Sequence, residues 1–256
     1  MAGQGFDLQV VKENFVASLT LGVIFDGDDT LWETQSLYLR AKSRFFAEME
    51  GLGFGRLQAE KELERIDLEN AREMGFSRAR FPKSMSDTYQ ALCLRHHREI
   101  DESVKKRAQS IGYSAFEEKP KVFDGVPEVL ETLERKNLRL ILATKGDQEI
   151  QKEKIEYSGL SSFFHRRYIF PEKGQTELEM VVWDCGLNPR ESWSIGNSMK
   201  SDINPALKIG LKAIWIPRST WHFEEEKPVH EQRLFKARSI KEVPKILTRR
   251  ISSRLA

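Results

Sequence analysis

The chain has 256 residues, of which 39% are apolar and 31% are charged, enough for one large domain or for a core with an insert. Its 41 basic and 39 acidic residues nearly cancel, which argues against a protein that binds nucleic acid through electrostatics. Residues 1–18 contain no secretory apolar region, and no run is long enough to span a membrane. We therefore expect a soluble, cytoplasmic protein.

Two cysteines, Cys93 and Cys185, are present, and they form no CxxC motif. Neither lies in a cluster of histidine and cysteine, so a structural zinc site is not expected. Both cysteines are expected to be packed thiols, and so few of them fit a reducing compartment.

Residues 19–25 form a short apolar run that stops at Asp26, Gly27, Asp28 and Asp29. A run of this length and composition predicts a buried strand. Its carboxyl end therefore delivers a cluster of carboxylates.

Residues 33–112 have a different pattern, with apolar residues at helical spacing among many charges and no β-branched run. This pattern predicts four helices, with loops at 51–55 and 75–83. The predicted helices lie near residues 37–49, 57–74, 86–98 and 101–111.

After Pro120, short apolar runs alternate with helical segments. Such alternation predicts a parallel sheet covered by helices on both faces. The predicted strands are 138–143, 167–170, 193–195 and 212–216, and the predicted helices are 124–135, 147–158, 178–185 and 202–208.

The domain organisation follows from these two patterns. Residues 1–33 and 120–256 are expected to form an α/β core, and residues 34–119 an inserted, all-helical cap. Both junctions lie near the strand that carries the carboxylates, so the insert is expected to stand over that strand end.

Open parallel sheets place their ligand sites beyond the carboxyl ends of the strands. Asp26 and Asp28 follow the first strand, so one carboxylate can attack an electrophile while the other transfers protons. A phosphate monoester suits such a pair. Mg²⁺ would remove the repulsion between carboxylates and phosphate, with Asp202 as a further ligand.

Other strand ends supply groups that fit the same chemistry. Thr144 can donate a hydrogen bond to a phosphoryl oxygen, and Lys173 offers a cation to balance the charge of nucleophile and phosphate. Lys145 is expected either to contact phosphate or to cap a helix. Asn197 follows the strand that leads to Asp202.

Together these motifs resemble the haloacid dehalogenase superfamily, in its phosphatase branch. The resemblance implies a Rossmann-like core with a helical cap, Asp26 as nucleophile and Asp28 as general acid and base. It also implies that Mg²⁺ binds the Asp26 carboxylate, the Asp28 backbone carbonyl and Asp202. The matching segments are residues 23–31, 141–146, 171–173 and 195–202.

Two positions depart from the superfamily pattern. Asn197 stands where many relatives carry a second acid, and we expect it to orient a metal-bound water or Asp202 and to bind phosphate. Gly27 replaces a larger apolar residue, and we expect a looser turn without chemical consequence.

The proposed activity is hydrolysis of a small phosphorylated metabolite by a monomer or homodimer. Dehalogenation is less favoured, because a halide leaves without a proton and would not need an acid at Asp28. A catalytically idle protein that binds partners through its cap and its basic C-terminal segment is the alternative of another class.

Several segments are expected near the cavity without an assigned role. Residues 77–83 carry three cations that either bind an anionic or polar leaving group or form an ordinary exposed loop between helices. Trp32 and Gln35 either line the entrance or, for Trp32, pack at the hinge. Residues 219–224, with His222, could form a lip over the site.

Overall fold

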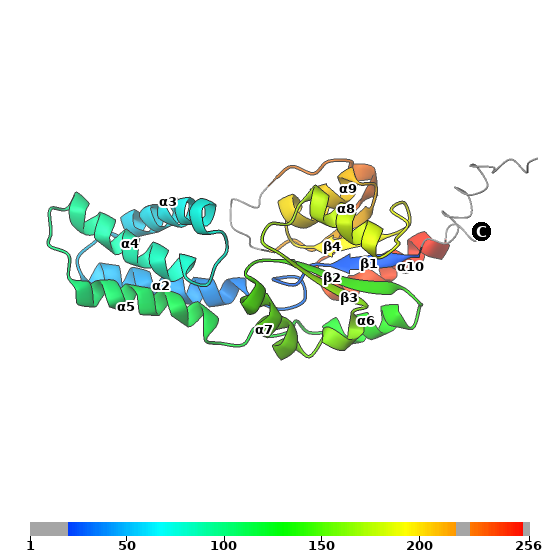
Figure 1. Ribbon diagram of the computed structural model, residues 1–256, viewed down its shortest axis with the longest axis horizontal. Helices are drawn as coiled ribbons and strands as arrows, with labels where there is room; N and C mark the ends of the chain where they lie inside the picture. Colours follow the sequence, from blue (N-terminus) through cyan, green and yellow to red (C-terminus); the bar gives the residue numbers. More distant parts are fainter. Residues whose placement is uncertain (1–19, 219–225, 253–256) are drawn as a thin grey trace, which may run out of the picture.

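A computed structural model describes residues 20–218 and 226–252 of the protein. Its centre is one parallel sheet of six strands in the order β3-β2-β1-β4-β5-β6 (Figure 1). The central β1 pairs with β2 on one side and with β4 on the other. The strands are β1 (Gly22–Phe25), β2 (Arg139–Lys145), β3 (Arg166–Phe170), β4 (Trp193–Gly196), β5 (Lys212–Trp215) and β6 (Leu234–Lys236).

Helices cover both faces of the sheet, and for this reason β1 is buried along its whole length (Figure 1). Val23 and Phe25 belong to the core beneath α6, α7 and α10, whereas Ile24 belongs to the core beneath α8 and α9. The predicted α/β fold class is thereby confirmed. The helices are α6 (Val126–Glu134), α7 (Gln148–Ser158), α8 (Gln175–Asp184), α9 (Asn204–Lys208) and α10 (Val243–Ser252).

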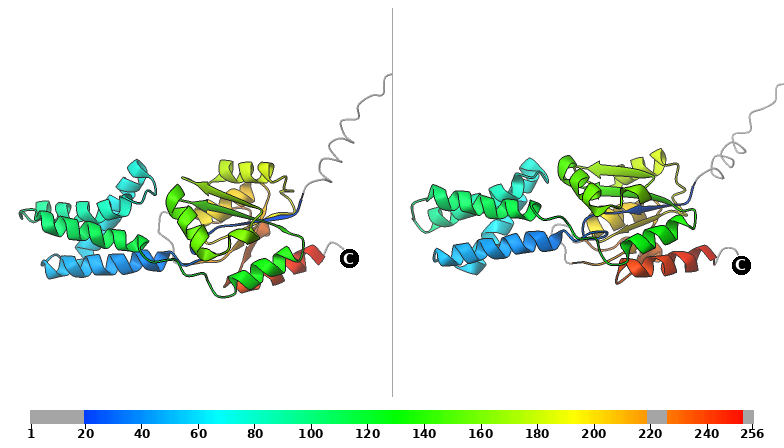
Figure 2. Two further views of the ribbon diagram at one scale, coloured as in Figure 1. Left: turned by 60° about the horizontal axis from the view of Figure 1, so that its bottom comes forward. Right: turned by 90° about the horizontal axis from the view of Figure 1, so that it is seen from below.

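Four further helices stand apart from the sheet and pack on one another (Figure 2). They enclose an apolar cluster of their own that includes Phe45, Met49, Leu63 and Met85, all essentially inaccessible to solvent. We call these helices the helical block. They are α2 (Gln35–Gly51), α3 (Arg56–Met74), α4 (Arg80–Arg95) and α5 (Glu102–Tyr113).

The chain leaves the sheet and returns to it at one place. Trp32 and Val122 form an antiparallel bridge. On either side of it, Glu33 N donates to Lys121 O at 2.8 Å and Phe123 N donates to Leu31 O at 3.0 Å. The two connections to the helical block therefore run side by side as a short paired segment.

Two differences from the predicted elements have a clear physical reason. Helix α4 begins at Arg80, inside the predicted loop 75–83, because Pro82 falls in its first turn, where a missing N–H costs little. Strand β6 was not predicted, since three residues at a sheet edge carry little periodic signal.

Some expectations concern residues outside the described ranges. The possible lip at 219–224, with His222, falls there, as does the whole N-terminal segment 1–18. No helix within residues 20–218 and 226–252 is both long enough and apolar enough to cross a membrane.

The close contact between α4 and α5 leads to a stability prediction. A Cβ on Gly112 would lie 2.5 Å from the backbone Cα of Pro82, whereas a Cβ on Gly51 would meet nothing within 4 Å. Gly112→Ala should therefore destabilise the fold by about 1–3 kcal/mol. Gly51→Ala, its matched control, should be neutral or stabilising by up to about 1 kcal/mol. Urea unfolding followed by circular dichroism measures both, and equal effects would contradict the close packing.

Candidate active site

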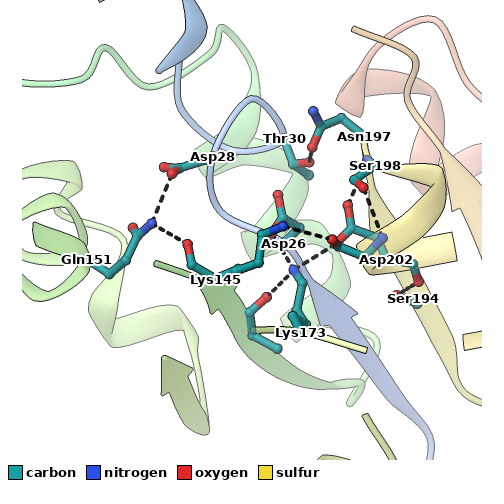
Figure 3. Close-up of polar contacts among 12 residues, drawn as sticks. Asp26, Asp28, Thr30, Lys145, Gln151, Lys173, Ser194, Asn197, Ser198 and Asp202 are labelled. Carbon is teal, nitrogen blue, oxygen red and sulfur yellow. Dashed lines mark hydrogen bonds and ion pairs between the residues drawn. The ribbon is translucent and has the colours of Figure 1, made fainter. Parts of the chain in front are cut away.

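A lysine ammonium joins two carboxylates at the ends of three different strands. Lys173 follows β3, and its Nζ lies 2.5 Å from Asp26 Oδ1 beyond β1 and 2.7 Å from Asp202 Oδ1 beyond β4 (Figure 3). The same ammonium donates to Ala143 O in β2 at 2.8 Å. All three side chains are buried. The structure thus brings together three of the residues predicted for the site.

Burial and neighbouring charges shift the pKa values of Asp26 and Lys173. Burial, followed by the nearby Asp202 carboxylate, raises the pKa of Asp26 to about 7 despite the opposing effect of Lys173. Burial acts to lower the pKa of Lys173, but the carboxylates of Asp202 and Asp26 raise it above the ordinary value. Lys173 is therefore a cation at neutral pH, whereas Asp26, with a pKa of about 7, is partly protonated there.

Asp202 is positioned by an unusual turn after β4. Residues Met199–Ile203 form one π-helical turn, a local geometry that is frequent at functional sites. Ser198 accepts a hydrogen bond from Ser201 N through its hydroxyl and donates its own N–H to Asp202 Oδ2 at 2.8 Å. The second carboxylate oxygen of Asp202 is left to face Lys173.

The Asp28 carboxylate points away from Asp26, toward α7 (Figure 3). Its Oδ1 accepts hydrogen bonds from Trp32 Nε1 at 2.7 Å and Thr34 Oγ1 at 2.9 Å. Its Oδ2 accepts from Gln151 Nε2 at 2.9 Å and Lys154 Nζ at 2.7 Å. Burial acts to raise its pKa, but Lys154 and these hydrogen bonds hold the pKa of Asp28 below its ordinary value. In this arrangement Asp28 is an anion.

Gly27 has a structural role that the sequence did not reveal. A Cβ at this position would lie 2.5 Å from the ring of Trp32, which is fully buried against the turn. The same indole donates to Asp28. The expectation of a looser turn without chemical consequence is therefore wrong. The missing side chain makes room for the indole that orients Asp28, so Trp32 is a packing residue rather than part of the entrance.

The remaining predicted site residues lie around this centre. Thr144 is completely buried at the end of β2, and its hydroxyl has no hydrogen-bond partner among the described residues. Lys145 donates to Ser201 Oγ at 3.2 Å and lies over the Phe76 ring. Asn197 Oδ1 accepts a hydrogen bond from Thr30 at 3.3 Å rather than contacting Asp202.

A cavity of about 190 Å³ lies between these residues and the helical block. Asp26, Thr144, Lys173 and Asp202 line its inner end. The helical block forms the outer wall of this cavity. Gln35 lines the cavity, as expected. Of the three cations in segment 77–83, Arg80 lines the cavity and is buried in an ion pair with Asp67, whereas Arg78 and Lys83 are exposed.

The donors at the inner end fit a hard divalent cation in part. Asp26 and Asp202 supply carboxylate oxygens, the ligands that Mg²⁺ prefers, and burial together with the nearby Asp202 carboxylate raises the pKa of Asp26. In the part of the chain that the structure describes, no three acidic, histidine or cysteine side chains form a ready metal cage. A cation would therefore be held by these two side chains with a backbone carbonyl.

Sequence reasoning missed the contacts that hold Asp28. Gln151 and Lys154 lie three residues apart on one face of α7 and reach Asp28 together. Their segment is rich in charged residues, so no sequence pattern separates Lys154 from its exposed neighbour Lys152. Both thiols are buried and free, as expected.

Comparison with known proteins finds relatives that are named as two different phosphatases. A segment of 102 residues is 35% identical to the N-acylneuraminate-9-phosphatase of Mus musculus, and spans 38% of this chain and 41% of that protein. A segment of 120 residues is 26% identical to the phosphoserine phosphatase of Thermus thermophilus, and spans 44% of this chain and 48% of that protein. The chain therefore matches less than half the length of either relative.

Solved structures match over nearly the whole chain. A haloacid dehalogenase-like family hydrolase from Xanthomonas campestris is 28% identical with a TM-score of 0.75, over 90% of this chain and 95% of that one. The family model of haloacid dehalogenase-like hydrolases matches residues 23–216, from β1 to the end of β5. These matches confirm the resemblance found in the sequence: the chain belongs to the haloacid dehalogenase-like hydrolase family.

Proposed function

We propose that this protein is a Mg²⁺-dependent phosphatase that hydrolyses a phosphate monoester of a small molecule through an aspartyl-phosphate on Asp26. The observation that carries the proposal is the grouping of Asp26, Lys173 and Asp202 beside the buried, unpartnered hydroxyl of Thr144. That hydroxyl is a ready donor for a phosphoryl oxygen, because a buried polar group without a partner is costly. The relatives named as phosphatases support the same class of reaction.

In the first step, an Asp26 oxygen bonds to phosphorus and the bond between phosphorus and the leaving oxygen breaks. Asp28 gives the leaving oxygen its proton. In the second step, water bonds to phosphorus, the Asp26–phosphorus bond breaks, and Asp28 takes the proton of the water. The sum is an alcohol and inorganic phosphate. Lys173 and the Thr144 hydroxyl stabilise the charge on the phosphoryl oxygens in both steps.

Asp28 needs a change of position for this role. In the structure it accepts hydrogen bonds from Gln151 and Lys154 and is an anion, so it cannot donate a proton there. Rotation about its side-chain bonds toward the cavity would release these donors and bring the carboxyl group to the leaving oxygen. The proposed cycle therefore includes two positions of Asp28.

A Mg²⁺ ion would be held by the carboxylates of Asp26 and Asp202 and by the backbone carbonyl of Asp28. It would supply positive charge that offsets the repulsion between these carboxylates and the phosphate. The helical block serves as the cap in this proposal, because it forms the outer wall of the cavity and would limit the entry of water.

Substitution of the nucleophile separates an enzyme from an idle binding protein. Asp26→Asn should reduce the hydrolysis of p-nitrophenyl phosphate by at least about 1,000-fold, because the amide cannot form the phosphoryl ester. Asp124→Asn, which alters an exposed surface ion pair with Lys241, is the matched control and should keep wild-type activity. Phosphate release measured at saturating Mg²⁺ tests both variants. A wild-type protein inactive on this ester and on a panel of phosphorylated sugars, amino acids and cofactors would contradict the proposal.

Metal binding is testable without turnover. Millimolar Mg²⁺ should raise the unfolding temperature of wild-type protein stripped with EDTA, because a ligand that binds only the folded state stabilises it. The increase should disappear in Asp202→Asn, which removes one of the two carboxylate ligands. Asp184→Asn, on the distant α8, keeps both ligands and serves as the control. Equal shifts in all three proteins would place the ion elsewhere.

A further inference from the structure

Lys42 lies on the face of α2 that lines the active-site cavity. Gln35, Tyr38 and Lys42 are spaced by three and four residues, so their side chains share one helix face. All three line the cavity that contains Asp26 and Asp202. Lys42 is partly buried, and it forms no ion pair or hydrogen bond with any residue that the structure describes. An ammonium group thus faces a half-enclosed cavity without an anion of its own.

The neighbouring acid is already neutralised by another cation. Asp67 is buried in an ion pair with Arg80 and also accepts a hydrogen bond from Ser84 Oγ at 2.8 Å. Burial lowers the pKa of Lys42, while the charges of Asp67 and Glu64 act to raise it and the smaller effect of Arg80 acts to lower it. The block residues that line the cavity include two cations, Lys42 and Arg80, and one acid, Asp67, so an anionic group of a ligand would neutralise the remaining positive charge.

That anionic group cannot be the phosphate that reacts at Asp26. Thr34, just before α2, contacts Asp28, and Lys42 lies eight residues farther along the helix. A rise of 1.5 Å per residue separates the two positions by about 12 Å along the axis. Because helical side chains lean toward the N-terminus, roughly 6 to 12 Å remains between the ammonium and the inner end. One molecule with two anionic groups spans that gap.

The geometry points to Lys42 as the residue that binds a carboxylate of the leaving group, so that the substrate class is the phosphate monoester of a sugar acid or polyol acid. This inference rests on the proposed phosphatase function and specifies its substrate. A single ammonium matches the single charge of a carboxylate better than that of a second phosphate dianion. The rings of Tyr38, Phe76 and Phe81 line the cavity between the two ends and provide a surface for the carbon chain.

Two phosphate esters that differ at one carbon test this assignment. 6-Phospho-D-gluconate and D-glucitol 6-phosphate share a six-carbon chain, and only the first has a carboxylate at C1. Wild-type protein should favour the carboxylate by about 10- to 100-fold in kcat/KM, the range expected for one charge-assisted hydrogen bond. Lys42→Met should bring the two values to within about threefold of each other and leave the glucitol ester within about twofold of wild type.

Lys61→Met is the matched control, because Lys61 is an exposed lysine of α3 that does not line the cavity. It should keep the full preference for the carboxylate. Equal turnover of both esters by wild type, an unchanged preference in Lys42→Met, or an equal loss on both esters would overturn the assignment. So would turnover of p-nitrophenyl phosphate without turnover of 6-phospho-D-gluconate. In contrast, failure of wild type on every phosphate ester would remove the proposed function itself.

Discussion

The ion pairs of Lys173 are the constraint on which the rest of the site depends. Two buried carboxylates at the ends of neighbouring strands would repel each other in a medium of low dielectric constant. The ammonium lies within 2.7 Å of both and also bonds to a carbonyl of β2, so it ties together the ends of three adjacent strands. The stability of these strand ends therefore depends on one buried side chain.

The sheet was largely predictable, because its central strands are buried on both faces and appear as apolar runs. Strands β1, β2 and β4 were found for that reason, and the four helices of the block were found from their periodicity. The start of α4 was misplaced because Pro82 was read as part of a loop, although proline is compatible with a first helical turn. The edge strand β6 was missed because three partly exposed residues have no distinctive pattern.

The site, like the sheet, was predictable where its residues lie at strand ends and was not predictable where it depends on tertiary contacts. Asp26 and Asp202 follow buried strands, Thr144 lies at the end of one, and Lys173 follows the partly exposed β3. All four strands belong to one parallel sheet, so the order of these residues in the chain is sufficient to predict that they meet. Lys154 reaches Asp28 because of the way α7 docks on the core, which no local pattern encodes. Gly27 shows the same limit, since its significance depends on an indole five residues away that folds back over it. Strand ends can be read from sequence, whereas the orientation of a helix and the path of a turn depend on tertiary packing.

The paired connections at Trp32 and Val122 affect how this architecture can evolve. Since the chain enters and leaves the helical block through neighbouring backbone positions, the block's two ends are fixed side by side whatever lies between them. Its helices can be lengthened, reordered or exchanged without altering the register of any strand. Selection can therefore diversify the side of the cavity that the helical block provides, while Asp26, Lys173 and Asp202 at the strand ends stay the same.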